Sequence, residues 1–258
     1  MKTPRFAYSR HRHGPPSPLT PSLQCNNVWI KYPRSEAPAV CDVSFSVAQG
    51  SRVALIGANG AGKSTLLKAA AGLLPVAAGN IRVHGSVPGG CCHRVAYLAQ
   101  RNDLDWRFPM TVRRFVLTGR YVHLGWFRRP HRDDLDIVDR MMALLQIADL
   151  ADRRIEELSG GQQQRTLLAR AMTQEADMLL LDEPFNAVDE QTRVVMREVL
   201  RALSQAGKTI VAATHDPREI EFEFDRVIRL SAGHQEQTPE PPLHENSRPL
   251  IGETQCTG

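Results

Sequence analysis

The sequence predicts an α/β fold in which buried strands alternate with helical crossovers. Three short apolar runs carry this prediction: residues 53–56 (VALI), 178–181 (MLLL) and 209–214 (TIVAAT). Continuous apolar runs of this length, bounded by glycine or acidic residues, are typical of strands buried on both faces. Helical periodicity lies between them, which favours a parallel sheet connected by crossover helices.

Length and composition narrow the class of protein. The 258 residues are 42% hydrophobic and 23% charged, which suits one globular unit or two lobes sharing a core. No run of eighteen apolar residues occurs, so the sequence predicts no membrane-spanning helix. The net charge of +4, from 32 basic and 28 acidic residues, is small for a nucleic-acid-binding protein. Five scattered cysteines favour a reducing compartment over a disulfide scaffold.

The two ends of the chain differ from its body. Residues 1–22 hold five prolines and four cationic residues without an acidic one, and predict a disordered leader. Residues 231–258 are polar and carry four prolines, so they predict a flexible tail. The ordered body is therefore expected over 23–230.

The remaining elements of the body follow from periodicity. Residues 28–32 and 43–47 alternate between polar and apolar, as half-exposed strands do. Leu66, Ala70 and Leu73 give a helical period directly after the 53–56 strand. Another strand is expected over 95–99.

The middle of the chain, about 102–172, reads as a mostly helical insertion. Leu135, Val138, Met142 and Leu145 fall on one helical face, which we expect to be buried. Few strand signals occur in this stretch.

Residues 57–65 read GANGAGKST and fit the phosphate-loop pattern G-x-x-x-x-G-K-[ST]. The glycines let several backbone N–H groups face one phosphate cluster, and the following helix directs its positive end at the anion. Lys63 can reach the β- and γ-phosphates, and the Ser64 hydroxyl can hold Mg²⁺. The alternative is an ordinary glycine-rich turn. The residues predicted to bind nucleotide here are Gly57, Asn59, Gly60, Gly62, Lys63, Ser64 and Thr65.

Two carboxylates follow the 178–181 strand. Asp182 is placed to hold the metal that accompanies a phosphate loop, and Glu183 to act as general base on an attacking water. Alone, they would be read as exposed carboxylates at a strand end. Beside a phosphate loop, the sequence favours a catalytic pair.

Residues 158–165 read LSGGQQQR, which resembles the signature of ATP-binding cassette (ABC) ATPases. The resemblance spans about 23–230. It implies a P-loop NTPase fold with a RecA-like core, an antiparallel β subdomain and a helical subdomain at about 102–172. In physical terms, Ser159, Gly160 and Gly161 open a helix whose N–H groups could bind a phosphate.

The resemblance also implies a dimer, because in this family two cassettes pack head to tail around two ATP molecules. Each γ-phosphate then lies between one subunit's phosphate loop and the other's signature, here Ser159, Gly160, Gly161 and Gln162. Asp189, in the stretch Asn-Ala-Val-Asp at 186–189, matches the loop linking the two sites. The commoner Ser-Ala-Leu is absent from that stretch.

Three further positions match the family. Tyr32 matches the aromatic that stacks on adenine, although a strand aromatic covering the core would look the same. Gln100 matches the glutamine that senses Mg²⁺ and contacts the membrane partner. His215 matches the switch histidine that orients the γ-phosphate and the water.

The cargo is predicted from a second resemblance. The stretches DWRFPMTV at 105–112, GRY at 119–121 and GWFRRP at 125–130 are similar to cassettes of the manganese/zinc/iron uptake family. Trp106, Phe108 and Pro109 would make an apolar groove wall near Gln100, fit for a short helix of a membrane subunit. They could equally be core of the helical insertion.

The sequence thus predicts the ATP-binding subunit of a bacterial importer, hydrolysing ATP with Mg²⁺ as a dimer to take up zinc or manganese. The implied partners are membrane permease subunits, an extracytoplasmic metal-binding protein and a second copy, at the cytoplasmic face of the plasma membrane. Chelated iron or another small nutrient is the alternative cargo.

A soluble ABC ATPase of a nucleic-acid machine is the remaining alternative, and the arginines within 113–132 are its only basic candidate. The acidic residues that follow them favour a solvated helical face without nucleic acid. The Cys-Cys-His stretch at 91–93 reads as a reduced thiol pair in a loop more than as a metal sensor.

Overall fold

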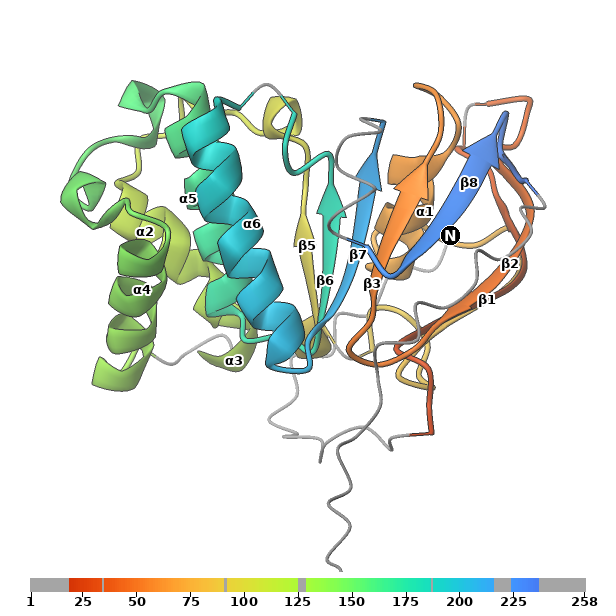
Figure 1. The fold of residues 1–258 in the computed structure, drawn as a ribbon, viewed down its shortest axis with the longest axis horizontal. Coiled ribbons are helices and arrows are strands. Elements are labelled where there is room, and N and C mark those ends of the chain that lie inside the picture. The colour runs from red at the N-terminus through yellow and green to blue at the C-terminus, as the bar shows by residue number, and fades with distance from the viewer. Residues whose placement is uncertain are drawn as a thin grey trace, which may run out of the picture.

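The computed structural model describes residues 19–236 except Arg34, Cys91, 125–128, Ala187 and 216–223. The predicted leader up to residue 18 and the tail from residue 237 lie outside the described residues. Within them, strands and helices alternate as the sequence predicts, and the α/β class is confirmed (Figure 1). Ser231 still belongs to a strand and a two-residue strand follows at His234–Gln235, so regular structure continues past residue 230.

A six-stranded sheet forms the centre of the molecule. Its strands are β3 (Arg52–Ile56), β5 (Val95–Leu98), β6 (Met178–Asp182), β7 (Thr209–Thr214), β8 (Arg226–Ser231) and β9 (His234–Gln235). Their order is β5-β6-β7-β3-β8-β9. The pairings among β5, β6, β7, β3 and β8 are parallel, and β9 runs antiparallel to β8.

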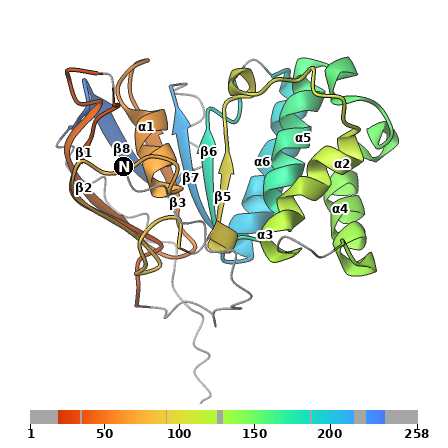
Figure 2. The ribbon, with the colours of Figure 1, turned by 180° about the vertical axis from the view of Figure 1, so that it is seen from behind.

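A separate antiparallel sheet of three strands stands at one side (Figures 1 and 2). It is made of β1 (Leu23–Ile30), β2 (Val40–Val47) and β4 (Ala78–Val83), in the order β2-β1-β4. Sequence analysis does not find β4, because its first three residues are exposed and only Ile81 and Val83 face inward. Two inward residues are too few for an alternating pattern to stand out.

The helices lie on both sides of the central sheet. Helix α1 (Lys63–Ala70) packs between the central sheet, at β6 and β7, and the small sheet, at β1 and β4. On the opposite side lie α2 (Val112–Leu117), α3 (Tyr121–Leu124), α4 (Arg132–Leu144), α5 (Gly160–Thr173) and α6 (Glu190–Gln205). Helices α2 to α5 fall where the sequence predicts a helical insertion.

The pleat of the sheet separates two hydrophobic cores. On β6, Leu179 and Leu181 pack with the helices α2, α4 and α5, whereas Met178 and Leu180 pack with α1 and the small sheet. Side chains alternate along a strand, so the next position, Asp182, follows Met178 and Leu180 toward α1. This alternation determines where the first acidic residue after the strand must lie.

Two details of the predicted helices are wrong. Leu135 is 37% exposed, and the neighbouring Asp134 is buried in its place. Asp134 faces inward because the buried Arg120 guanidinium lies there, with Nε 2.9 Å from the Asp134 carboxylate.

The helix after the phosphate loop ends at Ala70, and Gly72, with φ of 78°, terminates it in the left-handed conformation. Leu73 is consequently outside the helix and half exposed.

Adjacent leucines at the end of α4 test this account of the core. Leu145 is fully buried, whereas Leu144 is 47% exposed. We expect Leu145→Ala to lower the free energy of unfolding by about 2–5 kcal/mol and Leu144→Ala by less than about 1 kcal/mol. Urea denaturation of both variants measures the difference. Equal losses would show that the α4 face is assigned incorrectly.

Candidate functional site

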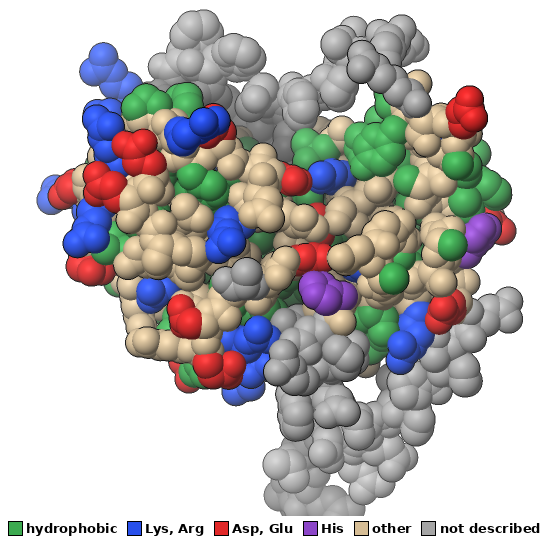
Figure 3. Space-filling view, turned by 90° about the horizontal axis from the view of Figure 1, so that it is seen from above, with side chains coloured by type: hydrophobic (Ala, Val, Ile, Leu, Met, Phe, Trp, Pro, Cys, Tyr) green, Lys and Arg blue, Asp and Glu red, His purple; other side chains and the backbone are tan. Residues whose placement is uncertain are grey.

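The candidate site lies at the carboxyl ends of the parallel strands, where the loop 57–62 joins β3 to α1. Figure 3 looks down on this face, and acidic, basic and histidine side chains gather in the middle of it. In open α/β sheets ligands bind in the crevice at this edge. The topology alone therefore brings the residues that follow β3, β5, β6 and β7 into one neighbourhood.

The glycines of the loop are required by close approaches of backbone. A Cβ on Gly57 would overlap the carbonyl oxygen of Leu230, and one on Gly62 would lie 2.5 Å from that of Ala39. Gly62 also has φ of 95°, a conformation that side chains rarely adopt. The loop is thus packed against β8 on one side and against the start of β2 on the other.

Lys63 is buried and curls back over the loop. Its Nζ donates to the carbonyl oxygens of Gly57 at 2.7 Å and Ala58 at 3.0 Å. Burial lowers the pKa of Lys63, and the nearby carboxylates of Glu183 and Asp182 oppose that shift. An ammonium held this way over a curled loop is placed to meet an anion in the loop.

Asp182 has no exposed surface, and three donors meet its carboxylate. The Ser64 hydroxyl donates to Oδ1 at 2.9 Å, the Gln100 amide to the same oxygen at 3.4 Å, and the Tyr97 hydroxyl to Oδ2 at 3.2 Å. Burial raises the pKa of Asp182, and these hydrogen bonds oppose the rise. Burial raises the pKa of Tyr97 as well, so its hydroxyl stays a donor.

Tyr97 is the site residue that sequence reasoning misses. Its position on β5, beside Leu180 in the parallel register, is the signal that could have found it. A polar tip on the penultimate residue of a strand neighbouring β6 can reach the residue that ends β6.

Glu183 projects from the same strand end toward the opposite side. Its Oε2 accepts from Asn186 Nδ2 at 2.9 Å, and its Oε1 lies 3.5 Å from His215 Nδ1. The two residues expected to be catalytic after β6 and β7 therefore stand side by side. A small cavity is lined by Gln100, Arg101, Asn102, Gln164, Glu183 and Asn186.

The donor set fits a hard cation. A carboxylate oxygen of Asp182, the hydroxyl of Ser64 and the carboxamide of Gln100 converge within 3.4 Å, and oxygen ligands are those that Mg²⁺ prefers. Gln100 at present directs its NH₂ group toward the other two. A half-turn of the amide would present Oε1 instead.

The signature residues lie apart from the phosphate loop. In both ribbon views the strands β5 to β7 stand between α1 and α5, which the signature opens (Figures 1 and 2). Ser159 and Gln162 cap α5 reciprocally, with Ser159 N donating to Gln162 Oε1 at 2.9 Å. Gly161 packs against Asp189, which caps α6 by accepting from Thr192 N at 2.7 Å. That hydrogen bond lowers the pKa of Asp189.

Tyr32 follows β1 and reaches the phosphate-loop side of the molecule. Its hydroxyl lies 3.1 Å from Thr65 Oγ1, and the residue is 39% exposed. An aromatic that only covered the core would be more deeply buried. Its stacking on adenine stays a prediction.

Of the apolar residues predicted to wall a groove near Gln100, one packs in the core of the helical insertion and another lies on the surface. Trp106 is half-buried, packs on Phe115 with ring centroids 5.9 Å apart, and donates to the Arg101 carbonyl at 3.0 Å. Phe108, by contrast, is 58% exposed. Trp106 thus belongs to the helical core, and Phe108 remains on the surface.

Two of the arginines weighed as a nucleic-acid contact, Arg113 and Arg120, form ion pairs within the fold. Arg113 pairs with Asp139 at 2.7 Å, and Arg120 is buried against Asp134 and Glu175. Arg128 lies outside the described residues. Cys91 and the Cys92 side chain lie outside them too, so the thiol-pair reading stays a prediction.

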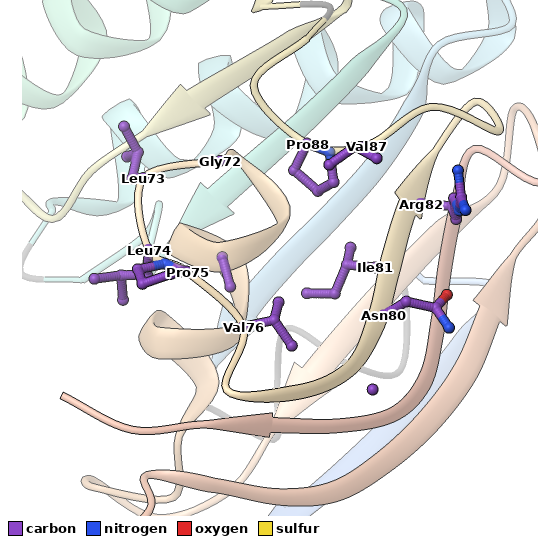
Figure 4. A pocket seen from close by; sticks show the side chains of 12 residues that line it. Gly72, Leu73, Leu74, Pro75, Val76, Asn80, Ile81, Arg82, Val87 and Pro88 are labelled. Atoms are coloured by element: carbon purple, nitrogen blue, oxygen red, sulfur yellow. The ribbon is translucent and has the colours of Figure 1, made fainter. Parts of the chain in front are cut away.

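A second pocket is apolar and lies away from the site. Leu73, Leu74 and Val76 line it from the turn after α1, Ile81 from β4, and Val87 from the following loop (Figure 4). None of the predicted site residues borders it. Without a cluster of polar groups it offers no chemistry.

Comparison with known proteins identifies the class. Residues 40–186 match the ABC transporter family. The chain is 42% identical to the zinc transport system ATP-binding protein TroB of Treponema pallidum, over 81% of this chain and 78% of that protein. It is 38% identical to the manganese transport system ATP-binding protein MntB of Bacillus subtilis, over 81% and 82%.

Among solved structures, an ATP-binding cassette in a dimeric post-hydrolysis state with ADP and Pi superposes with a TM-score of 0.76. It is 24% identical, over 86% of this chain and 99% of that one, and shows the shared fold. The chain belongs to the ABC transporter family and is a nucleotide-binding ABC ATPase domain. Within the described ranges, every helix is too short or too polar to cross a membrane.

Two glycines of the loop give a matched test of the site. Gly62 and Gly60 are both left-handed, but a Cβ on Gly60 would meet nothing within 4 Å. We expect Gly62→Ala to weaken binding of a fluorescent ATP analogue by about tenfold or more, and Gly60→Ala by clearly less. Equal affinities for the two variants would mean that the packing of the loop against Ala39 does not shape the site.

Proposed function

We propose that this chain is the ATP-hydrolysing subunit of a bacterial importer of a transition metal ion, zinc or manganese. The observation that carries the proposal is the convergence of Lys63, Ser64, Gln100, Asp182 and Glu183 at one strand edge of an ABC ATPase domain. The cargo follows from the relatives, whose names specify zinc and manganese transport.

Nucleotide binding is assigned to the phosphate loop. The backbone N–H groups of 57–62 and the first turn of α1 supply donors for phosphate oxygens. Lys63 would exchange the carbonyl oxygens it now contacts for the β- and γ-phosphates. Tyr32, next to Thr65, would cover the adenine.

Mg²⁺ would be held by Ser64, with Asp182 and Gln100 beside it. When bound, it neutralises charge on the phosphate oxygens. Tyr97 holds the Asp182 carboxylate from the side away from Ser64, which keeps Oδ1 directed at α1.

Glu183 is assigned as the general base. Its carboxylate is 12% exposed and would accept a proton from the attacking water. His215 lies beside Glu183, where it would orient the water and the γ-phosphate. Asn186 fixes the second carboxylate oxygen by its 2.9 Å hydrogen bond.

Completion of each site requires a second copy. Ser159, Gly160, Gly161 and Gln162 lie across the sheet from the phosphate loop of their own chain, so the N–H groups of Gly160 and Gly161 in the first turn of α5 would serve the partner's ATP. Asp189, packed on Gly161, would link the two sites across the dimer.

The dimer is proposed to work on membrane permease subunits from the cytoplasmic face of the plasma membrane. An extracytoplasmic metal-binding protein would deliver the cargo. The two cassettes would close on binding ATP and open after hydrolysis. This movement would be transmitted to the permease through the segment after Gln100, where Phe108 is exposed.

A strain lacking the gene tests both the transported metal and the role of Glu183 as general base. Cellular zinc, manganese and iron are measured under limitation of each metal, with the strain carrying the native gene, Glu183→Gln or nothing. We expect the native gene to restore the content of zinc or manganese, and Glu183→Gln to fail because water attack loses its base.

The remaining outcomes separate the alternatives. Restoration of iron alone would transfer the cargo to chelated iron. Unchanged content of all three metals in the deletion strain would remove the metal assignment. Full restoration by Glu183→Gln, expressed at the native level, would remove the general-base assignment.

A further inference from the structure

Gln164 is a buried polar side chain within the signature stretch 158–165, and the resemblance assigns it no nucleotide contact. It is 1% exposed, and its Nε2 donates to the carbonyl oxygen of Pro184 at 2.7 Å. Burying a primary amide is costly unless it is hydrogen-bonded, so this contact is a strong constraint on both partners. Pro184 is the residue directly after Glu183.

The backbone at Glu183 is in a conformation that needs such a constraint. Glu183 has φ of 49°, in the left-handed region that is unfavourable for a residue other than glycine. Its N–H donates to Ala213 on β7 at 3.0 Å, and its carbonyl accepts from Asn186 N at 3.2 Å. The Gln164 side chain, on α5, adds a third hydrogen bond to this backbone, at the carbonyl oxygen of the next residue, Pro184.

Gln164 also lines the cavity beside the Glu183 carboxylate. Gln164 and Glu183 line the same small cavity, together with Gln100. Helix α5 therefore contacts both the cavity beside the Glu183 side chain and the backbone directly after Glu183.

The same helix begins with the signature. Near its start Gly161 leaves room for Asp189, and one turn later Gln164 binds Pro184. The segment from Pro184 to Asp189 is thus attached to α5 at both ends. A shift of the first turns of α5 would be passed to the backbone of Glu183.

We propose that Gln164 is a positioning residue that holds the general base Glu183 in register with the signature helix of its own chain. The inference rests on the proposed function, in which that signature contacts the partner's ATP. Each chain's Glu183 is then aligned when its signature closes on the other site, and the hydrogen bond to Pro184 carries the alignment. Gln164 acts on Glu183 through the backbone and is assigned no contact of its own with ATP or with the attacking water.

The first test replaces the donor without changing the size of the side chain. We expect Gln164→Met to lower kcat for ATP by about tenfold or more, since small displacements of a reacting group cost this much. The KM for ATP should change by less than about twofold, because no nucleotide contact is lost. The exposed Gln205 at the end of α6 provides the matched control, and Gln205→Met should retain the native kcat.

A double-mutant cycle separates positioning from general damage. If Gln164 acts through Glu183, adding Gln164→Met to Glu183→Gln lowers the residual turnover no further. ATP-dependent dimerisation of Glu183→Gln, followed by sedimentation, should also survive the second substitution. A further fall by the same factor, or loss of dimerisation, would overturn the inference.

A second variant keeps the test usable if Gln164→Met does not fold. Gln164→Glu retains the shape, and its carboxyl can donate to Pro184 only when protonated. At pH 8 its kcat should therefore lie about tenfold or more below the native value with the KM for ATP unchanged, and a native kcat at that pH would contradict the inference. The proposed function fails separately, if Glu183→Gln hydrolyses ATP at the native rate.

Discussion

The buried carboxylate of Asp182 is the constraint on which the rest of the site depends. A carboxylate without exposed surface must be surrounded by donors, and here they come from α1, from β5 and from the loop after β5. Ser64 ties the start of α1 to β6, while Tyr97 and Gln100 tie the neighbouring strand to the same atoms. Three segments distant in the sequence are thereby brought to one point.

Because side chains alternate along β6, the two acidic residues at its end face different sides of the central sheet. Asp182 faces α1 and the phosphate loop, whereas Glu183, in a left-handed turn, faces Asn186 and His215. The two cores on either side of the sheet follow the same alternation, with Leu180 on one side and Leu181 on the other. The residues proposed to bind the metal and to activate water therefore face different layers of the fold.

Much of this arrangement is readable from the sequence, for physical reasons. The strands found correctly are those buried on both faces, such as 178–181, because continuous apolar runs are hard to mistake. The phosphate loop, Asp182 and Glu183 are found because their spacing is dictated by a strand, a turn and a helix. Placement of His215 beside Glu183 follows from the order β6-β7 in a parallel sheet.

What sequence reasoning misses depends on tertiary partners. Tyr97 and Gln164 take their proposed roles from contacts to Asp182 and Pro184, which no local pattern encodes. Leu135 is exposed because Arg120 draws Asp134 inward, an ion pair that reverses the order expected from hydrophobicity. Single buried polar contacts of this kind override periodicity at the level of individual residues and leave the fold intact.

The central claim is that one copy's phosphate loop meets another copy's signature, and cross-linking measures this directly. Asn59 and Ser159 are both exposed, and they precede α1 and α5, which stand on opposite sides of strands β5 to β7 (Figure 2). Two single-cysteine chains, Asn59→Cys and Ser159→Cys, are made in the Glu183→Gln background with the five native cysteines replaced by alanine. With ATP and Mg²⁺ and a short thiol cross-linker, the mixture should give a covalent dimer that neither chain gives alone. Absence of that dimer while both chains bind ATP would contradict the account.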